Sequence, residues 1–167
     1  MRPAPFEVVA ASDALPWINC IPLVSLKAAA GHVGDEKLVE PDAWVRPNGS
    51  TKPATGLFVA RVEGESMNRR IPNGAYCVFR RPVAGSRNGR VVLEHRDIID
   101  PDLEGPFTLK IWESSKTAGA DGSWAHEEIL LRPDSTDSGY EPIRLANDPE
   151  AAQVAAELVE VLDGSPA

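Results

Sequence analysis

Proline and glycine interrupt this sequence so often that long helices are disfavoured over most of it. The chain has 15 prolines and 13 glycines among its 167 residues, spread over the whole length. Proline removes a backbone donor and clashes with the preceding helical turn, so it ends or kinks a helix. The apolar segments between these breaks are short, which favours strands.

Residues 56–63 (GLFVARVE) are interpreted as alternating with period two, which predicts a strand. The other predicted strands are residues 21–26, 75–81, 91–94, 107–112, 129–132 and 143–145. Turn-rich stretches separate them at residues 84–89, 97–106, 117–123 and 134–139, and at Pro72-Asn73-Gly74. Many short strands joined by close turns predict an all-β sandwich or barrel.

The C-terminal segment fits two structures. Residues 149–162 are rich in alanine and glutamate and could form one helix capped by Asp148. Residues 155–162 also alternate apolar and acidic side chains, as a final strand would. Periodicity does not choose between them. We expect residues 163–167 to be frayed.

The composition limits the location and the partners. Hydrophobic residues make up 43% of the chain, enough for one packed domain, and the net charge is −8. An acidic chain is a poor general binder of nucleic acid or of an anionic membrane. Residues 1–14 do not resemble a signal peptide, and no segment is apolar enough to span a bilayer. The two cysteines, Cys20 and Cys77, could form one disulfide, but so few cysteines favour a reducing compartment. We therefore expect the cytoplasm.

The segment Val62–Met67 carries the first candidate for chemistry. A predicted strand enters the turn Gly64-Glu65-Ser66, which would expose the serine hydroxyl and direct backbone N–H groups at one point. The same residues also fit an ordinary serine in a strand-end turn. The three histidines, His32, His95 and His126, have no recognisable triad context. A lysine is the other available base.

Lys110 lies in the otherwise uncharged segment Phe107–Trp112. A free lysine has a pKa near 10.4, so only about one molecule in a thousand is neutral near pH 7. Burial in an apolar site can lower the pKa of a lysine to roughly 7–8, as a general base requires. Strand alternation places Thr108, Lys110 and Trp112 on one face. The alternative is a lysine whose stem is half buried while its ammonium reaches solvent.

Four blocks of the sequence resemble the cleavage domains of the LexA, UmuD and phage-repressor family. Residues 58–74 (FVARVEGESMNRRIPNG) resemble the strand and turn that carry the family's serine, and residues 108–111 (TLKI) resemble its lysine strand. Residues 130–143 (LLRPDSTDSGYEPI) resemble a later strand and turn. Residues 21–31 (IPLVSLKAAAG) resemble the segment with the scissile Ala-Gly bond. The blocks keep the family's order.

The resemblance implies a Ser-Lys peptidase domain over residues 21–162, with a signal-peptidase-like barrel or highly bent sheets, after an N-terminal extension at residues 1–20. Ser66 would be the nucleophile and Lys110 the general base, and the backbone N–H groups of Ser66 and Glu65 would stabilise the oxyanion. Met67 would be core. The bond Ala30–Gly31, within the cleavage segment 21–35, would be cut by the chain itself. Residues 28–31 could equally be a short helix end capped by Gly31.

Partners and cofactors follow from the same resemblance. The substrate would be the chain's own N-terminal segment, and the chain would act as a homodimer or with a helicase, repair or defence protein, in an SOS or DNA-damage response. The residues before Ile21 are too few for a helix-turn-helix, so we expect no direct sequence-specific DNA binding. We expect no metal and no cofactor. The alternatives are a non-cleaving interaction module and a peptidase that cuts another protein.

Two further features concern charge and the turn after the serine. Six arginines and no acid lie between Ser66 and Leu93: Arg69, Arg70, Arg80, Arg81, Arg87 and Arg90. They could form a surface for an acidic partner, or a solvated face balanced by acids elsewhere in the fold. The family usually has Asp where Glu65 stands and Asp-Gly-Asp where residues 73–75 read Asn-Gly-Ala, a change expected to alter the hydrogen bonds of the turn.

Overall fold

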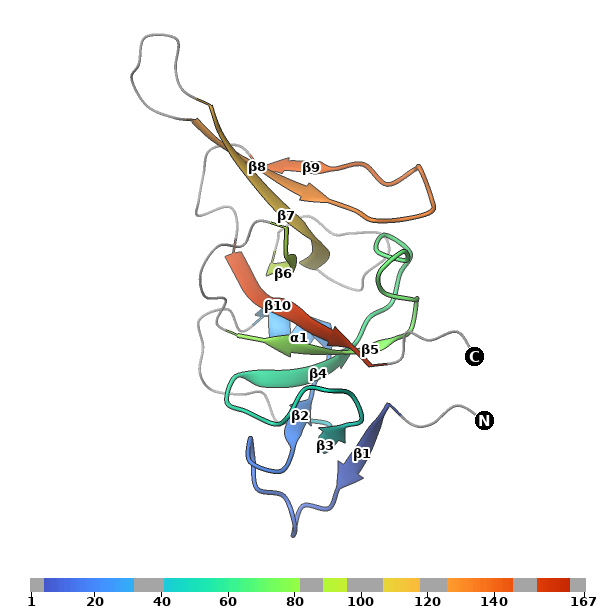
Figure 1. Ribbon diagram of the computed structural model, residues 1–167, viewed down its shortest axis with the longest axis vertical. Helices are drawn as coiled ribbons and strands as arrows, with labels where there is room; N and C mark the ends of the chain where they lie inside the picture. Colours follow the sequence, from blue (N-terminus) through green and yellow to red (C-terminus); the bar gives the residue numbers. More distant parts are fainter. Residues whose placement is uncertain are drawn as a thin grey trace.

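The computed structural model describes residues 5–31, 41–81, 89–95, 107–117, 126–145 and 153–162 (Figure 1). Within these residues the chain forms a ten-stranded mixed sheet and one short helix, α1 (Leu26–Gly31). The strands are β1 (Phe6–Val9), β2 (Ile21–Leu23), β3 (Ala43–Pro47), β4 (Leu57–Arg61), β5 (Tyr76–Arg80), β6 (Val91–His95), β7 (Phe107–Thr117), β8 (His126–Arg132), β9 (Ile143–Leu145) and β10 (Gln153–Val161).

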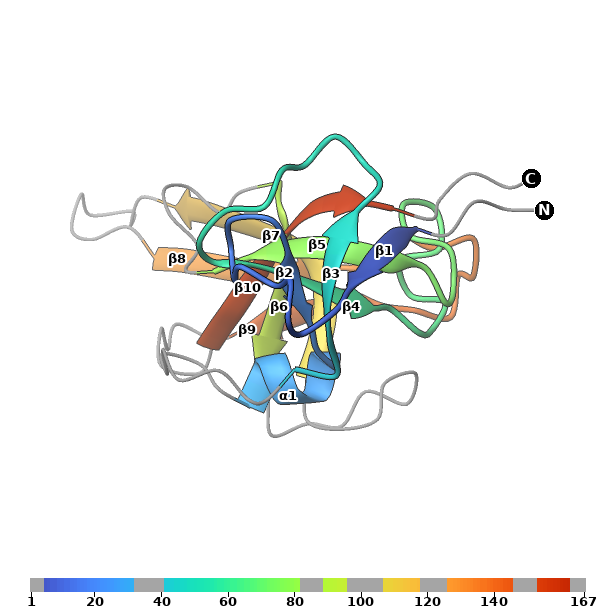
Figure 2. The same ribbon diagram turned by 90° about the horizontal axis from the view of Figure 1, so that it is seen from below.

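The sheet order is β1-β3-β2-β4-β5-β10-β6-β7-β8-β9. Neighbouring strands are antiparallel except β2 and β4, which are parallel. The edge strands β1 and β9 lie at opposite ends of the molecule (Figure 1), and strand directions change strongly along the sheet, so that β3 runs across β5 in Figure 2. The predicted all-β fold is confirmed, and the sheet is not closed into a barrel.

The C-terminal segment is a strand, so the helical alternative for residues 149–162 is wrong over the part that is described. β10 lies between β5 and β6 in the centre of the sheet. It has two register irregularities, one between Val154 and Ala156 and one between Leu158 and Glu160. The proposed cap Asp148 and the tail 163–167 lie outside the described residues.

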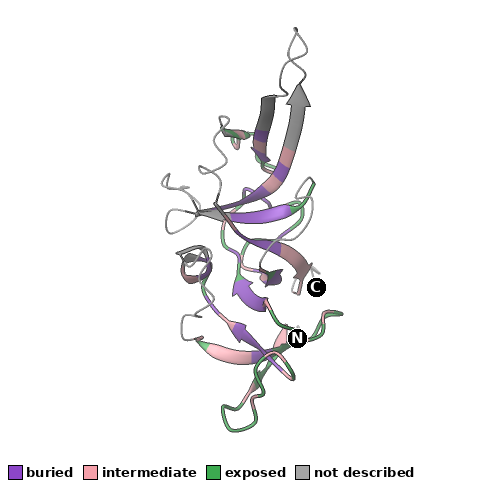
Figure 3. Ribbon diagram, turned by 90° about the vertical axis from the view of Figure 1, so that its left-hand side faces the viewer, coloured by how far each residue is buried: buried purple, intermediate pink, exposed green. Residues whose placement is uncertain are grey.

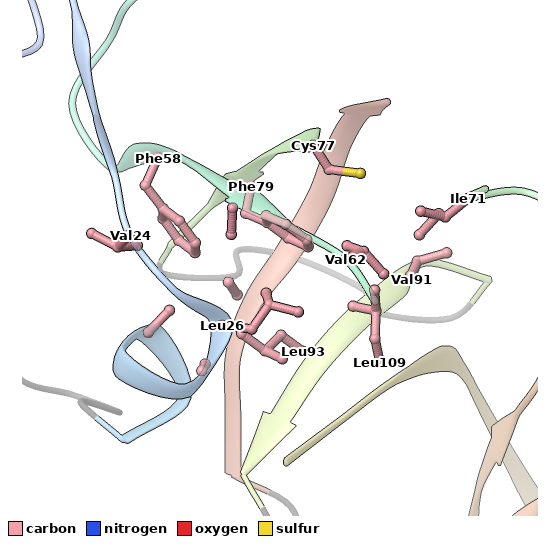
Figure 4. Packing of buried hydrophobic residues seen from close by; sticks show 14 of the residues in the cluster. Val24, Leu26, Phe58, Val62, Ile71, Cys77, Phe79, Val91, Leu93 and Leu109 are labelled. Carbon is pink, nitrogen blue, oxygen red and sulfur yellow. The ribbon is translucent and has the colours of Figure 1, made fainter. Parts of the chain in front are cut away.

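The core follows from strands that are buried on both faces. Successive residues of β4 point to opposite sides, so Phe58 and Ala60 enter one apolar cluster while Leu57 and Val59 enter another. Figure 3 shows the buried residues concentrated in the middle of the molecule, and Figure 4 shows the first cluster, where Phe58 and Phe79 stack. A third, smaller cluster contains Val92, Trp112, Ile129 and Leu131.

Two strands, β1 and β3, were not predicted from the sequence. β1 lies at the sheet edge, and its residues Glu7 and Val8 are exposed, so it has no clean alternation of burial. β1 pairs with β3, which joins the expected N-terminal extension to the same sheet. The indole of Trp17 donates a hydrogen bond to the Leu57 carbonyl at 3.1 Å, and this fastens the segment before β2 to β4.

The helix α1 packs against β6, β7 and β10 (Figure 2). Its residues Leu26 and Ala29 are buried in the first cluster, and Figure 4 shows Leu26 beside Leu93. The Ala30–Gly31 bond therefore lies in helical backbone, as the alternative prediction for this segment had it. In the described part of the chain, no helix has the length and apolarity needed to cross a membrane.

Candidate active site

Ser66 lies in the loop that joins β4 to β5. The loop is closed at its base, where the Val62 N–H donates to the Ala75 carbonyl at 2.8 Å and the Gly74 N–H donates to the Val62 carbonyl at 2.7 Å. The Ala75 N–H donates to the Pro72 carbonyl at 3.0 Å, and Gly74 has a φ of +89°, which confirms the predicted turn. Such a closed loop gives Ser66 a defined backbone.

Two apolar side chains anchor the same loop from below. Met67 and Ile71 are 3% and 0% exposed and belong to the first core cluster. The predicted core role of Met67 is confirmed. These two buried side chains fix the position of the loop that carries Ser66.

Lys110 meets Ser66 although the two residues are 44 positions apart. The Lys110 Nζ lies 3.0 Å from the Ser66 Oγ, within hydrogen-bond distance. Ser66 is 6% exposed and Lys110 is 3% exposed, so neither side chain is open to bulk solvent. The structure therefore brings together the two predicted catalytic side chains, and the solvated position that was the alternative for Lys110 is wrong.

The Lys110 amine also contacts two other acceptors on its own strand. The Nζ donates to the Thr108 hydroxyl at 2.9 Å and to the Leu109 carbonyl at 3.2 Å. Thr108 is 2% exposed. Sequence reasoning did not single out Thr108 as a site residue, although the two-residue spacing on one strand face was the signal that could have found it.

Two buried apolar residues neighbour Lys110 in the sheet. Val92 lies directly opposite Lys110 in the ladder between β6 and β7, and it is fully buried. Trp112, two residues along the same face, is 6% exposed. Val92 and Trp112 belong to the third core cluster, so the strand face that carries Lys110 is buried.

A second loop, residues 134–136 after β8, is joined to the serine loop by backbone and side-chain hydrogen bonds. The Asp134 N–H donates to the Ser66 carbonyl at 2.9 Å, and the Ser135 hydroxyl donates to the Glu65 carbonyl at 2.7 Å. The Arg69 N–H donates to the Asp134 carbonyl at 3.1 Å. The sequence placed this block downstream of the lysine but did not predict its contact with Ser66.

The carboxylate of Glu65 organises the serine loop internally. Its two oxygens each accept a hydrogen bond at 3.0 Å, one from the amide of Asn68 and the other from the amide of Asn73. Asn73 in turn accepts a hydrogen bond from the Gly64 N–H at 2.9 Å. The turn at Asn73-Gly74-Ala75 therefore has a hydrogen bond from its Asn73 side chain to Glu65, whose side chain is longer than the aspartate expected at that position.

The predicted oxyanion donors are the N–H groups of Ser66 and Glu65. Among the described residues, neither N–H has a hydrogen-bond acceptor. Backbone donors at a serine nucleophile can stabilise the negative charge of a tetrahedral intermediate.

The predicted cleavage site is not placed at the dyad as an extended segment. Ala30 and Gly31 end α1, which is docked on the core through Leu26 and Ala29. A peptide bond within a helix cannot present its carbonyl to a nucleophile as an extended strand does. Cleavage there requires the end of α1 to unwind.

The arginine-rich segment is largely balanced by acids from elsewhere in the chain. Asp134 pairs with Arg70 at 2.8 Å and lies 3.9 Å from Arg69. Glu157 pairs with Arg90 at 2.6 Å and lies 3.7 Å from Arg80. The guanidinium of Arg81 lies over the Phe58 ring, 5.7 Å from its centroid, whereas Arg87 lies outside the described residues. Four of the six arginines therefore lie close to acidic side chains, as expected for a surface whose charges are balanced within the fold.

Both cysteines are buried. Both Cys20 and Cys77 are free thiols, so the open possibility of a disulfide between them is not realised. Burial raises the pKa of the Cys77 thiol to about 12, which keeps it protonated at neutral pH.

Among the described residues, no three histidine, cysteine or acidic side chains form a group that could hold a metal ion. The chain matches no protein-family model and no curated protein.

Proposed function

We propose that this chain is a serine endopeptidase that uses Ser66 and Lys110 as a catalytic dyad, like the LexA/UmuD cleavage domains that its sequence resembles. The observation that supports this most directly is the buried contact between the Lys110 Nζ and the Ser66 Oγ at 3.0 Å. A general base must lie within hydrogen-bond reach of the proton that it removes. The free, buried thiols of Cys20 and Cys77 fit a cytoplasmic location.

The first chemical step forms an acyl-enzyme. The neutral Lys110 amine takes the hydroxyl proton of Ser66 while the Oγ bonds to the carbonyl carbon of the substrate. The oxygen of the resulting tetrahedral intermediate carries a negative charge, for which the N–H groups of Ser66 and Glu65 are the proposed donors. When the C–N bond breaks, the Lys110 ammonium returns the proton to the leaving amine.

The second step restores the enzyme. Water attacks the ester carbon, and the Lys110 amine takes a proton from it. The ester C–O bond then breaks, and the proton moves from Lys110 to the Ser66 Oγ. The products are a carboxylic acid and an amine, and the acid's proton passes through solvent to the amine to give a carboxylate and an ammonium. Ser66 and Lys110 return to their starting states.

We propose the chain's own Ala30–Gly31 bond as the substrate, reached after the end of α1 unwinds. Purified chain is incubated at pH 7 and at pH 10, and the intact mass is followed with time. We expect two fragments that meet between residues 30 and 31, formed faster at pH 10 because more of the lysine is neutral. Ser66→Ala and Lys110→Met should slow their formation at least about 10³-fold.

A wild-type chain that stays intact at both pH values would contradict self-cleavage. Fragments that form equally in Ser66→Ala would point to a contaminating peptidase. Lys110→Met keeps the apolar stem of the lysine, so its loss of activity is not explained by a cavity.

A second candidate, cleavage of another protein, is favoured by the helical state of residues 26–31. An extended segment from another chain could reach Ser66 without unfolding α1. The test is a quenched fluorescent peptide with the sequence of residues 25–36, added to the full chain. Cleavage of the peptide without loss of the intact chain supports this candidate, and failure of both reactions leaves a non-cleaving interaction module.

A further inference from the structure

The hydroxyl of Ser135 contacts the backbone on which the proposed nucleophile stands. The Ser135 Oγ donates to the Glu65 carbonyl at 2.7 Å, and the same carbonyl accepts the Asn68 N–H at 3.2 Å. The hydroxyl also accepts the Asp137 N–H at 3.0 Å, which fixes its position in the second loop. Ser135 therefore links the loop after β8 to the peptide unit that precedes Ser66.

The hydrogen bond from Ser135 to the Glu65 carbonyl also fixes the direction of the Ser66 N–H. The Glu65 carbonyl and the Ser66 N–H belong to one planar peptide unit, and in a trans peptide the two groups point in opposite directions. A hydrogen bond that holds the carbonyl oxygen of Glu65 thus holds the N–H of Ser66 on the other side. The same reasoning applies to the next unit, where the Asp134 N–H holds the Ser66 carbonyl at 2.9 Å.

The other side chains of the network do not act on this peptide unit. Thr136 contacts the side chain of Asn68, donating through its N–H at 2.8 Å and accepting through its hydroxyl at 2.9 Å. Arg70 contacts the Asp134 carboxylate at 2.8 Å. Only the Ser135 side chain, among the described side chains, contacts the carbonyl of Glu65.

We propose that Ser135 is a positioning residue of the peptidase: its hydroxyl orients the Ser66 N–H as an oxyanion donor. This inference rests on the proposed function. The hydroxyl does not touch the reacting atoms, so its removal should leave Lys110 and substrate binding intact. Removal of a whole oxyanion donor costs about 10²- to 10³-fold in kcat, and loss of its orientation should cost less, about 10- to 100-fold.

The experiment measures kcat, KM and the pH profile of the full chain with the peptide of residues 25–36. Ser135→Ala should lower kcat about 10- to 100-fold, with KM and the pH midpoint of the rate unchanged. Ser135→Thr keeps the hydroxyl and should restore kcat. Ser135→Cys keeps the size but donates weakly, so its kcat should lie between those of Ser135→Thr and Ser135→Ala.

Thr136→Ala is the matched control, because its hydroxyl lies in the same turn but makes no hydrogen bond to the Glu65 carbonyl. It should retain the wild-type kcat. A wild-type kcat in Ser135→Ala, or an equal loss in Thr136→Ala, would overturn the inference while leaving the peptidase proposal intact. A shift of the pH midpoint in Ser135→Ala would also overturn it, since the effect would then pass through Lys110. A wild-type chain that cleaves neither the peptide nor itself overturns both proposals.

Discussion

The proposed mechanism uses Lys110 as a neutral base. A neutral amine has two N–H bonds and one lone pair. The Thr108 hydroxyl at 2.9 Å and the Leu109 carbonyl at 3.2 Å can accept the two hydrogens. The lone pair can then face the Ser66 Oγ at 3.0 Å, which is the orientation that proton removal needs.

Substitution of Thr108 tests this orientation. Thr108→Val keeps the shape of the buried side chain but removes its oxygen, so the amine can rotate away from Ser66. We expect kcat for the peptide of residues 25–36 to fall about 10-fold, a fraction of the usual contribution of general-base catalysis. Thr108→Ser should stay close to wild type. An unchanged rate in Thr108→Val would show that the hydroxyl does not orient the base.

At the scale of the element, β10 stabilises the sheet through two acidic residues. Glu157 is 5% exposed and forms ion pairs with Arg80 of β5 and with Arg90, which directly precedes β6. Glu160 accepts hydrogen bonds from the Ser50 N–H at 3.0 Å, the Ser50 hydroxyl at 2.7 Å and the Thr51 N–H at 3.1 Å. Glu160 thereby ties the segment after β3 to the central strand.

The pKa of Glu160 determines the pH range in which its carboxylate accepts these hydrogen bonds. Burial raises the pKa, but the hydrogen bonds from Ser50 and Thr51 outweigh it, and the pKa of Glu160 is lowered from its ordinary value of 4.5. The stabilisation is therefore complete above pH 4.5 and is lost as the pH falls through the lower, folded-state pKa.

We expect Glu160→Gln to lower the free energy of unfolding by about 1 kcal/mol at pH 7, because partly exposed charge-assisted hydrogen bonds contribute modestly. The difference from wild type should shrink as the pH is lowered towards 3. Urea denaturation across this pH range measures it. Glu7→Gln, which removes an exposed pair with Arg46, is the control and should have almost no effect. A pH-independent difference for Glu160→Gln would contradict the explanation.

At the scale of the whole molecule, docking of α1 on the core would oppose the proposed self-cleavage. In the proposed reaction the end of α1 unwinds before Ala30–Gly31 reaches Ser66, so weaker docking of α1 should raise the rate. Leu26 anchors α1, being 5% exposed and packed in the first cluster. Truncation of a buried leucine costs about 2–5 kcal/mol.

We expect Leu26→Ala to speed self-cleavage at least several-fold, while its kcat for the added peptide stays within about twofold of wild type. Intact mass and peptide fluorescence measure the two rates. Val45→Ala is the control, because Val45 is fully buried in the cluster on the other face of β4 and its loss destabilises the fold away from α1. If both variants speed self-cleavage equally, global unfolding rather than release of α1 controls the reaction.

Some parts of the fold could be predicted from local pattern and others could not. β4 was found because it is a short apolar segment that starts next to a glycine, although it is buried on both faces and not alternately. The turn Pro72–Gly74 was found because its residues have strong backbone preferences. β10 was ambiguous because its irregularities place Ala155, Leu158 and Val161 at helix-like spacing against one cluster. A β-bulge adds one residue to a strand, so the alternation of faces shifts by one position after it.

The sequence by itself determined the all-β class, the serine in its turn after β4 and the lysine in an uncharged strand, since each depends on neighbouring residues. Only the tertiary structure decided that Ser66 and Lys110 lie 3.0 Å apart, and that residues 134–136 hold the serine loop. It also decided that Ala30–Gly31 is helical and docked. Local pattern encodes backbone conformation and side-chain face, whereas distances between remote residues arise from how the strands pair and the cores pack.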